Sequence, residues 1–373
     1  MRKLVILASA CLVTALLLTV PALAAEGRIP LWEPTVLPGP GIDGKYIVTR
    51  NITAPAGGTA ISVFGTGQEE VDIDLDGKTL FGDPAGAANI IEVIDVRTVV
   101  IRNGSLRALG PPAGGNSVFI DNVQKVILED LRIEDGGIGI YLTGSPNFAV
   151  RRNVIVGADP VGIQIEGAGL PFPLTGFVED NLVKDSIDIG IWVFDNHSGV
   201  SIDRNRVDRT FGGPGILVQF GGACKLAENI VQEAGGDGIQ LEGIRGCKVY
   251  NNVTSFNNAN GIAGLSTSST LFLDNVSSDN SSSGLVTDGF VNRIEQNVLT
   301  LNGACGLWLL GPDNTYGKNT ARGNAGGAAC GPCGAAPLAV CPIAGGSFPP
   351  DLCVDGPGNT SFCDNLMPGP PTE

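Results

Sequence analysis

The chain consists of many short runs in which apolar residues alternate with other residues, and each run ends near glycine or asparagine. Alternation with a period of two predicts β-strands that bury one face. No stretch shows the three-to-four-residue spacing of apolar positions that a long amphipathic helix requires. The pattern therefore predicts an all-β protein made of short strands and tight turns.

One unit recurs along the chain, most clearly in residues 200–207, 224–231, 247–254, 270–277 and 292–299. Each copy has alternating apolar residues, then asparagine, then another apolar residue. The asparagines recur every 22 to 28 residues, at Asn153, Asn181, Asn205, Asn229, Asn252, Asn275, Asn297 and Asn319. In the preceding repeats, Asp130, Asn103 and Gly77 are expected at the equivalent place.

A second marker has the same period. Glycine followed by an apolar residue, any residue and another apolar residue occurs at Gly139, Gly162, Gly190, Gly215, Gly238, Gly261, Gly284 and Gly306. These glycines are also 22 to 28 residues apart. Two independent markers that vary together indicate a true structural repeat.

The length of the repeat determines how it can fold. A unit of two or three short strands cannot bury its apolar face alone, so successive units must stack. Stacked coils lie about 4.8 Å apart, and the asparagines then form a column of hydrogen-bonded amides. We expect a single-stranded right-handed parallel β-helix of about 11 to 12 coils. A leucine-rich repeat has a similar period, but its leucine signature is missing.

The repeats resemble those of the right-handed parallel β-helix proteins, the pectate-lyase-like superfamily. The resemblance covers residues 60–326 and a last unit at 358–366. It matches no particular member family. It implies the fold, and it implies a function among those of the superfamily, which include polysaccharide lyases, glycosidases, epimerases, phage tailspikes and adhesins.

The two ends of the chain differ from the repeats. Residues 1–24 have a basic start, a long apolar run and a small-residue cleavage site, as in a Sec signal peptide. We expect export to the periplasm or beyond the cell. Residues 25–59 are expected to cap the β-helix of residues 60–326. Residues 327–373 form a Cys/Gly/Pro-rich insertion with a terminal coil.

The mature chain is strongly acidic. Without Arg2 and Lys3, 21 basic residues remain against 38 acidic ones, a net charge of −17. This charge repels nucleic acid and anionic membranes, so we expect neither as a partner, and no later segment is apolar enough to span a membrane. It also repels acidic polysaccharides unless calcium bridges them. The segment 235–238, Gly-Gly-Asp-Gly, leaves calcium open, and no other cofactor or metal site is expected.

Eight cysteines remain after signal cleavage, an even number that indicates disulfides in an exported protein. Cys224 and Cys247 occupy the same position in adjacent coils, which places them within disulfide distance. A pair of buried free thiols is the alternative. The other six candidates, grouped near the terminal cap, are Cys305, Cys330, Cys333, Cys341, Cys353 and Cys363.

In the resembled fold, the strand that follows the glycine marker lines a groove open to solvent. Residues two and four places after the marker point outward if alternation holds. In the middle of this face they provide a ligand-binding set, Phe119, Tyr141, Gln164, Trp192, Phe194 and Gln219, and two acids, Asp121 and Glu166. The acids are two coils apart, about 9.6 Å along the axis, near the spacing of an inverting glycosidase pair. Glu242 and Asp288 form a second pair.

Two longer connections, 108–115 and 167–176, flank the same coils and are expected to wall the groove. The only histidine, His197, lies in an Asp-Asn-His-Ser-Gly segment that predicts a surface turn.

The catalytic signatures of the known β-helix enzymes are missing. The Gly-His-Gly and Arg-Ile-Lys motifs of polygalacturonases are absent, and Asp159-Pro160 is not followed by the histidine of alginate epimerases.

Three functions stay open. The first is an extracellular protein that binds carbohydrate or another polymer. The second is a polysaccharide-active enzyme that uses Asp121 and Glu166. The third is a structural or adhesive rod.

Overall fold

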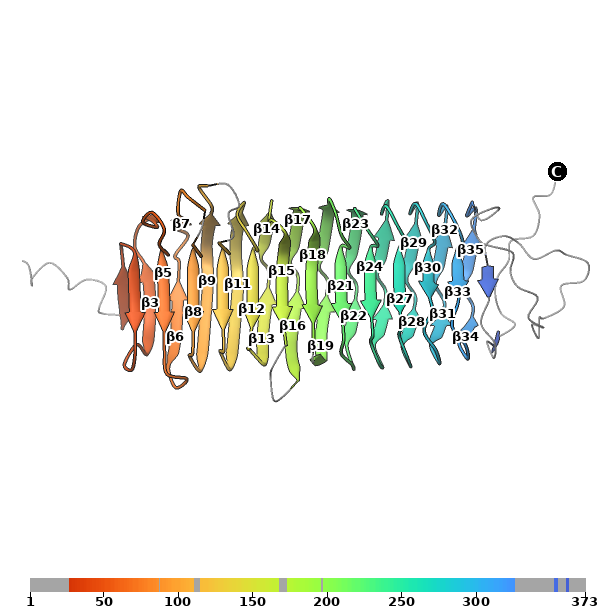
Figure 1. Cartoon of the computed structure of the whole chain (residues 1–373), viewed down its shortest axis with the longest axis horizontal. Helices are drawn as coiled ribbons and strands as arrows, with labels where there is room; N and C mark the ends of the chain where they lie inside the picture. Colours follow the sequence, from red (N-terminus) through yellow and green to blue (C-terminus); the bar gives the residue numbers. More distant parts are fainter. Residues whose placement is uncertain are drawn as a thin grey trace, which may run out of the picture.

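A computed structural model describes residues 27–86, 88–110, 115–167, 173–195 and 197–325, with two further strands at Leu352–Val354 and Thr360–Ser361. The described ranges contain strands and turns only, so none of them holds a helix able to cross a membrane. The chain winds into a long rod in which each coil lies beside the next (Figure 1). The predicted signal peptide at 1–24 lies outside the described residues.

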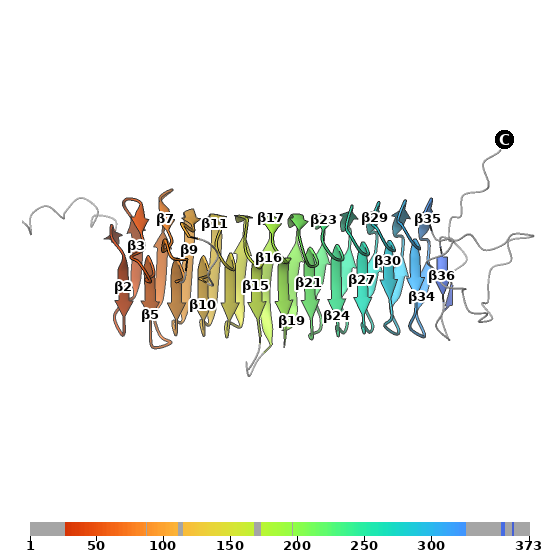
Figure 2. The same ribbon diagram turned by 45° about the horizontal axis from the view of Figure 1, so that its top comes forward.

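One wall of the rod is a thirteen-stranded parallel sheet to which each coil contributes one strand. Figure 2 shows these strands side by side along the rod. Its first strands are β2 (Thr35–Pro38), β5 (Ile61–Phe64), β8 (Ile91–Ile94), β10 (Val118–Asp121), β12 (Ile140–Thr143) and β15 (Val161–Glu166). The sheet continues with β18 (Ile189–Phe194), β21 (Ile216–Gln219), β24 (Ile239–Glu242), β27 (Ile262–Leu265), β30 (Leu285–Thr287), β33 (Leu307–Leu309) and β36 (Leu352–Val354).

The other strands form a twenty-four-stranded sheet that bends at the asparagine turn into two rows. The first row holds β1 (Arg28–Leu31), β3 (Gly44–Val48), β6 (Glu70–Asp74), β13 (Asn147–Arg151), β16 (Leu174–Glu179), β19 (His197–Asp203), β22 (Lys225–Ala227), β25 (Lys248–Tyr250), β28 (Leu271–Leu273), β31 (Arg293–Glu295), β34 (Thr315–Gly317) and β37 (Thr360–Ser361). The second row holds β4 (Ile52–Thr53), β7 (Thr79–Phe81), β14 (Val154–Val156), β17 (Leu182–Ser186), β20 (Arg206–Thr210), β23 (Ile230–Ala234), β26 (Val253–Ser255), β29 (Val276–Ser278), β32 (Val298–Thr300) and β35 (Thr320–Arg322). The long strands β9 (Thr98–Arg107) and β11 (Lys125–Glu134) span both rows.

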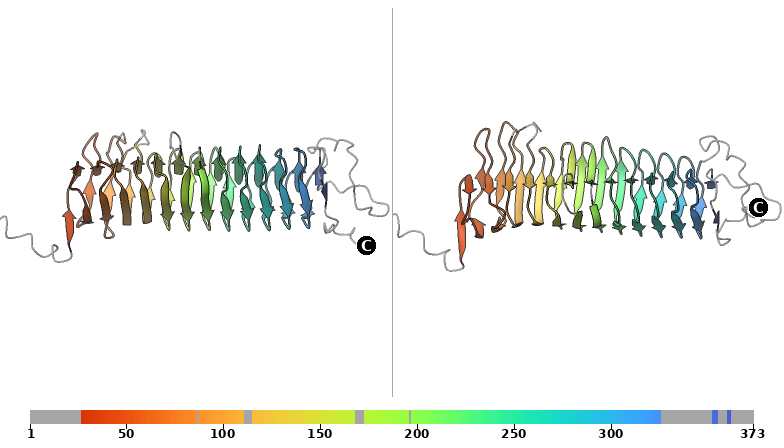
Figure 3. Two further views of the ribbon diagram at one scale, coloured as in Figure 1. Left: turned by 90° about the horizontal axis from the view of Figure 1, so that it is seen from below. Right: turned by 60° about the horizontal axis from the view of Figure 1, so that its bottom comes forward.

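All strand pairs are parallel, and each strand pairs with its counterpart one coil away. The rod therefore has about twelve turns, and the predicted all-β parallel solenoid is confirmed. Further views show the same stacking on the other sides (Figure 3). Because register is kept over many coils, residues in equivalent positions form straight columns along the rod.

The interior changes along the rod. In the N-terminal coils it consists of large aliphatic side chains, such as the fully buried Ile73, Ile101 and Leu128. In the C-terminal coils small polar side chains replace many of them, including Thr254 and Ser277, which are also fully buried. The Ser277 hydroxyl donates a hydrogen bond to the Gly284 carbonyl at 2.8 Å. The buried Ser277 hydroxyl is thus paired within the coil stack, whereas the buried Thr254 hydroxyl has no hydrogen-bond partner among the described residues.

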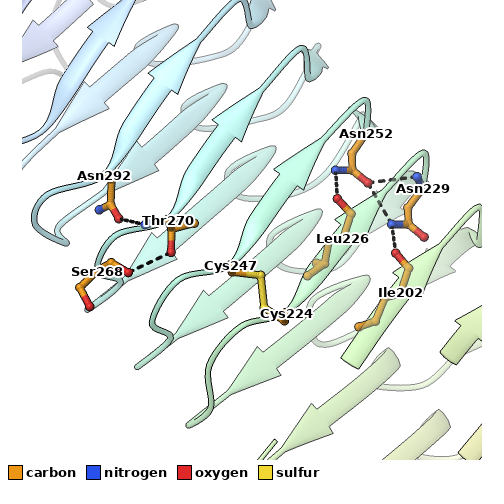
Figure 4. The surroundings of a disulfide bond; sticks show 9 residues. All are labelled: Ile202, Cys224, Leu226, Asn229, Cys247, Asn252, Ser268, Thr270 and Asn292. Atoms are coloured by element: carbon orange, nitrogen blue, oxygen red, sulfur yellow. Dashed lines mark hydrogen bonds between the residues drawn. A yellow bond between two sulfur atoms is a disulfide. The ribbon is translucent and has the colours of Figure 1, made fainter. Parts of the chain in front are cut away.

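The recurring asparagines form a buried ladder (Figure 4). The Asn229 side-chain amide donates to Oδ1 of Asn252 at 2.9 Å and to the Ile202 carbonyl at 2.8 Å. Oδ1 of Asn252 also accepts the main-chain N–H of Asn229 at 3.0 Å. The same bonds link Asn153 to Asn181 and Asn181 to Asn205. From Asn153 onward, the ladder therefore satisfies polar groups of the turn in successive coils.

The predicted extension of this ladder toward the N-terminus is wrong by one residue. Strand register aligns Asn153 with Leu131, not with Asp130, and aligns Leu131 with Gly104. Asp130 and Asn103 instead hold the left-handed turn residue that precedes the ladder position, with φ of 56° and 61°. Aspartate and asparagine suit that conformation too, which explains the misplacement.

A second asparagine ladder lies at the next corner of the coils. The amide of Asn257 donates to Asn280 at 2.8 Å, Asn280 to Asn302 at 2.9 Å, and Asn302 to Asn324 at 2.8 Å. Each of these asparagines follows a residue of the first ladder by five positions. That spacing is visible in the sequence, although this second ladder was not among the predicted features.

The predicted bond between Cys224 and Cys247 is present, with a Cα–Cα distance of 4.5 Å (Figure 4). It joins adjacent coils inside the core, so the alternative of two free thiols is excluded. Cys305 is disulfide-bonded as well. The side chains of Cys330, Cys333, Cys341, Cys353 and Cys363 lie outside the described residues, and their pairing stays a prediction.

Candidate functional site

The candidate site lies on the outward face of the thirteen-stranded sheet. Strand register places the predicted residues in two columns. The first column contains Glu92, Phe119, Tyr141, Gln164, Trp192, Leu217 and Gln240. The second contains Ile94, Asp121, Thr143, Glu166, Phe194, Gln219 and Glu242. The sheet thus brings all eight predicted site residues onto one continuous surface.

Four aromatic side chains form two pairs on this surface. The rings of Phe119 and Tyr141, on neighbouring strands, are 5.4 Å apart and tilted by 56°. The rings of Trp192 and Phe194, on one strand, stack at 4.3 Å with an angle of 23°. Gln164 lies between Tyr141 and Trp192 in the same column. The two pairs offer half-buried ring faces on either side of an amide.

A small cluster of buried apolar residues packs against Trp192. Val161, Ile189 and Leu217 are buried and form a cluster separate from the main core, and Ile138 and Trp192 pack against it. Ile138, Val161 and Ile189 each come directly before a marker glycine. This platform was not among the predicted features, although the repeated apolar–glycine dipeptide is visible in the sequence. The platform keeps the indole in place before any ligand binds.

Hydrogen bonds hold the polar side chains in defined positions. The Tyr141 hydroxyl donates to Oε2 of Glu166 at 2.5 Å. The Trp192 indole N–H donates to Oε1 of Gln219 at 2.8 Å, and Nε2 of Gln219 donates to Oε2 of Glu242 at 2.5 Å. The second chain of bonds crosses three strands. It orders aromatic and polar groups together along the face.

Two side chains on the face have shifted acidity. Burial, and then the hydrogen bond to Glu166, raises the pKa of Tyr141 to about 12, so the phenol stays protonated and remains a donor. Burial, and then the charge of Asp95, raises the pKa of Asp121, while a hydrogen bond from the Asn122 main chain opposes the shift. Asp121 therefore keeps its proton to a higher pH than an ordinary aspartate.

The second pair of acids is less suited to chemistry. Glu242 accepts the hydrogen bond from Gln219, and the Asp288 carboxylate accepts one from the Ser266 main chain. Leu265 occupies the coil between them. The candidate walls at 108–115 and 167–176 include residues 111–114 and 168–172, which lie outside the described residues.

His197 is not in a surface turn, so that prediction is wrong. The residue begins β19 and only 2% of it is exposed. Pairing with β16 shifts register at this point, which turns the imidazole into the core. The ring packs over Gly221 of the next coil, where an added Cβ would lie 2.3 to 2.4 Å from ring atoms. His197 is a core residue and takes no part in the outward face.

No cluster of three or more potential ligands suggests a metal site within the described residues. Asp237, in the segment that left calcium open, is nearly buried, and its Oδ1 accepts hydrogen bonds from the N–H and the side-chain amide of Asn260 at 2.8 and 2.9 Å. Burial raises the pKa of Asp237. These contacts join two coils, as a structural side chain does.

Comparison with known proteins agrees with this architecture. A family model described as the right handed beta helix region matches residues 44–207 and 189–331. No curated protein sequence matches the chain.

Three solved structures illustrate the likeness. A variant of the periplasmic alginate epimerase AlgG is 16% identical, with a TM-score of 0.62 over 81% of this chain and 77% of the epimerase. AlgG itself is 15% identical, with a TM-score of 0.54 over 81% of this chain and 76% of AlgG. The A-module of the mannuronan C-5 epimerase AlgE4 from Azotobacter vinelandii is 14% identical, with a TM-score of 0.52 over 81% of this chain and 89% of the A-module. At such identities the likeness establishes the fold alone.

Proposed function

The chain belongs to the right-handed β-helix family, and from this premise we propose that it binds an extracellular glycan along the outward face of its thirteen-stranded sheet. The observation that carries the proposal is the arrangement of Tyr141, Gln164 and Trp192 in one column, with ring faces on both sides of an amide. Aromatic rings bury the apolar faces of sugars, and amides and carboxylates bind their hydroxyls.

The shape of the face suits a polymer better than a small molecule. Its binding groups extend over the strands from β10 to β24, about 24 Å along the rod at one strand spacing per coil. The hydrogen bonds from Trp192 to Gln219 and from Gln219 to Glu242 fix side-chain positions in advance. A site ordered in this way loses less conformational entropy when the ligand binds.

The similar solved structures also support a glycan partner. They are epimerases of mannuronan and alginate, which are polysaccharides, on the same solenoid architecture. Function is nevertheless determined by the site and not by the fold. The proposal for this chain therefore depends on its own aromatic and polar columns.

The test is binding of the mature protein to an array of soluble polysaccharides, measured by calorimetry for each candidate. Trp192→Ala removes a ring that rests on a buried platform, so affinity should fall at least about tenfold. Phe177→Ala is the matched control, since this exposed aromatic lies on the other sheet, in β16. Equal affinity of both variants and wild type would rule out the proposed face.

Catalysis is a second candidate function, because the raised pKa of Asp121 suits a proton donor and Glu166 lies two coils away. Mass spectrometry of treated polysaccharides detects hydrolysis as added water and lyase action as unsaturated ends. Proton NMR detects epimerisation, which leaves the mass unchanged. Activity that survives in both Asp121→Asn and Glu166→Gln would exclude these residues as its source.

A further inference from the structure

Gln164 lies at the centre of the proposed binding face and is 8% exposed. It is on the outward side of β15, between Tyr141 and Trp192. Within the described residues its side-chain amide has no hydrogen-bond partner, whereas the neighbouring Tyr141 and Trp192 are both paired. The amide atoms are not sealed from solvent, so the oxygen and the N–H groups of Gln164 are available to a ligand that covers the face.

The charged side chains of the two outward columns that contain Gln164 and its neighbours are all acidic. The two outward columns from β5 to β30 contain the carboxylates of Glu92, Asp121, Glu166 and Glu242, and no lysine or arginine. Asp288 adds a further carboxylate beyond the end of β30. Glu166 and Glu242 keep free lone pairs, because the hydrogen bonds from Tyr141 and Gln219 use only one oxygen of each carboxylate. Such a face attracts cations and repels anionic polymers.

On the basis of the proposed function, we infer that the glycan is a polymer of amino sugars carrying protonated amines. Its sugar rings stack on Tyr141 and Trp192, and one ammonium group is held by the Glu166 carboxylate and the amide oxygen of Gln164. The aromatic rings add cation–π attraction to the same ammonium group. The Glu166 carboxylate, the ring faces of Tyr141 and Trp192 and the amide oxygen of Gln164 lie close together on the face.

Other glycans use fewer of these features. A uronate polymer would bring its carboxylates next to Asp121, Glu166 and Glu242, and like charges in contact are unfavourable. A neutral or N-acetylated glycan can stack on the rings, but it leaves the carboxylates without an ionic partner. The inference therefore separates this chain from proteins that act on alginate, even though the solenoid is shared.

The experiment compares oligomers of equal length made of glucosamine, N-acetylglucosamine, glucose and a uronic acid, the last with and without calcium. Wild type should bind the glucosamine oligomer about tenfold more tightly than its N-acetylated form at low salt. This preference should shrink between about 0.01 M and 1 M salt, because screening weakens ionic attraction. Glu166→Gln should reduce the preference at least about threefold.

Glu134→Gln is the matched control, since it removes the same charge from β11 on the other sheet and should leave the preference unchanged. Equal affinity for the glucosamine, N-acetylglucosamine and glucose oligomers, with loss of all binding in Trp192→Ala, would overturn the inference and leave the proposed function standing. Tighter binding of the uronate, with or without calcium, would overturn the inference in the same way. If no glycan binds, both the inference and the proposed function fail.

Discussion

The hydroxyl of Tyr141 and the carboxylate of Glu166 are joined by a hydrogen bond of 2.5 Å across adjacent strands of the outward face. The bond connects the two kinds of group that the face presents, an aromatic ring and an acid. It also keeps the ring beside Gln164, where we propose that a sugar stacks. The pair is therefore the natural starting point for mutation.

Tyr141→Phe removes the donor and keeps the ring. We expect the free energy of unfolding to fall by about 1 kcal/mol, because both partners are only half-buried. Denaturant unfolding of Tyr141→Phe, Glu166→Gln and the double variant measures the coupling. If the two single effects simply add, the hydrogen bond contributes nothing to stability.

The predicted repeat is correct because its signal is redundant, with an asparagine and a glycine marker in most coils from Gly139 onward. The outward columns could also be predicted, since strict alternation fixes which side chains face solvent. The bonds between Tyr141 and Glu166, and between Trp192 and Gln219, could not be predicted, because they depend on side-chain conformations set by neighbours one coil away. His197 was misplaced because its polar neighbours are typical of turns, while a local register shift determines its direction.

His197→Leu should change how stability depends on pH. Burial lowers the pKa of His197 to about 4 in the folded protein, against smaller opposing effects of the Gln219 main chain and Asp195. Its value in the unfolded chain is about 6.5. The folded state therefore binds the proton less tightly, so stability is retained above pH 6.5 and lost as pH falls toward 4.

Between pH 7 and pH 4, His197 should lower the free energy of unfolding by on the order of 3 kcal/mol. Denaturant unfolding at both values, in wild type and His197→Leu, isolates it because all other groups are common to both proteins. Leucine already occupies the same position one coil earlier, at Leu174. An equal acid-induced loss in both proteins would show that His197 is not responsible.

Gly221→Ala should destabilise the fold through the same histidine. An added Cβ would lie within 2.4 Å of the His197 ring, so the ring or the coil must move, at a cost of about 1 to 3 kcal/mol. In a His197→Ala background the space is open and the substitution should cost much less. Thermal unfolding of the four proteins tests this, and an equal cost in both backgrounds would exclude the contact as the cause.

Asn229→Ala should break the buried ladder at its centre. The change removes bonds to Asn205, Asn252 and the Ile202 carbonyl, so we expect a loss of about 3 kcal/mol. Asn258→Ala is the control, because this asparagine is exposed and belongs to neither ladder. Comparable stability of the two variants in denaturant would contradict a stabilising role for the ladder.

The change of the interior from large aliphatic side chains, such as Ile101, to hydroxyl side chains, such as Ser277, gives the two ends of the rod different responses to temperature. Exposure of apolar surface raises the heat capacity of unfolding, and exposure of polar surface lowers it. The N-terminal coils thus lose part of their driving force on cooling, whereas the C-terminal coils have a flatter stability curve. One continuous stack of coils therefore has no single temperature at which every part of it is most stable.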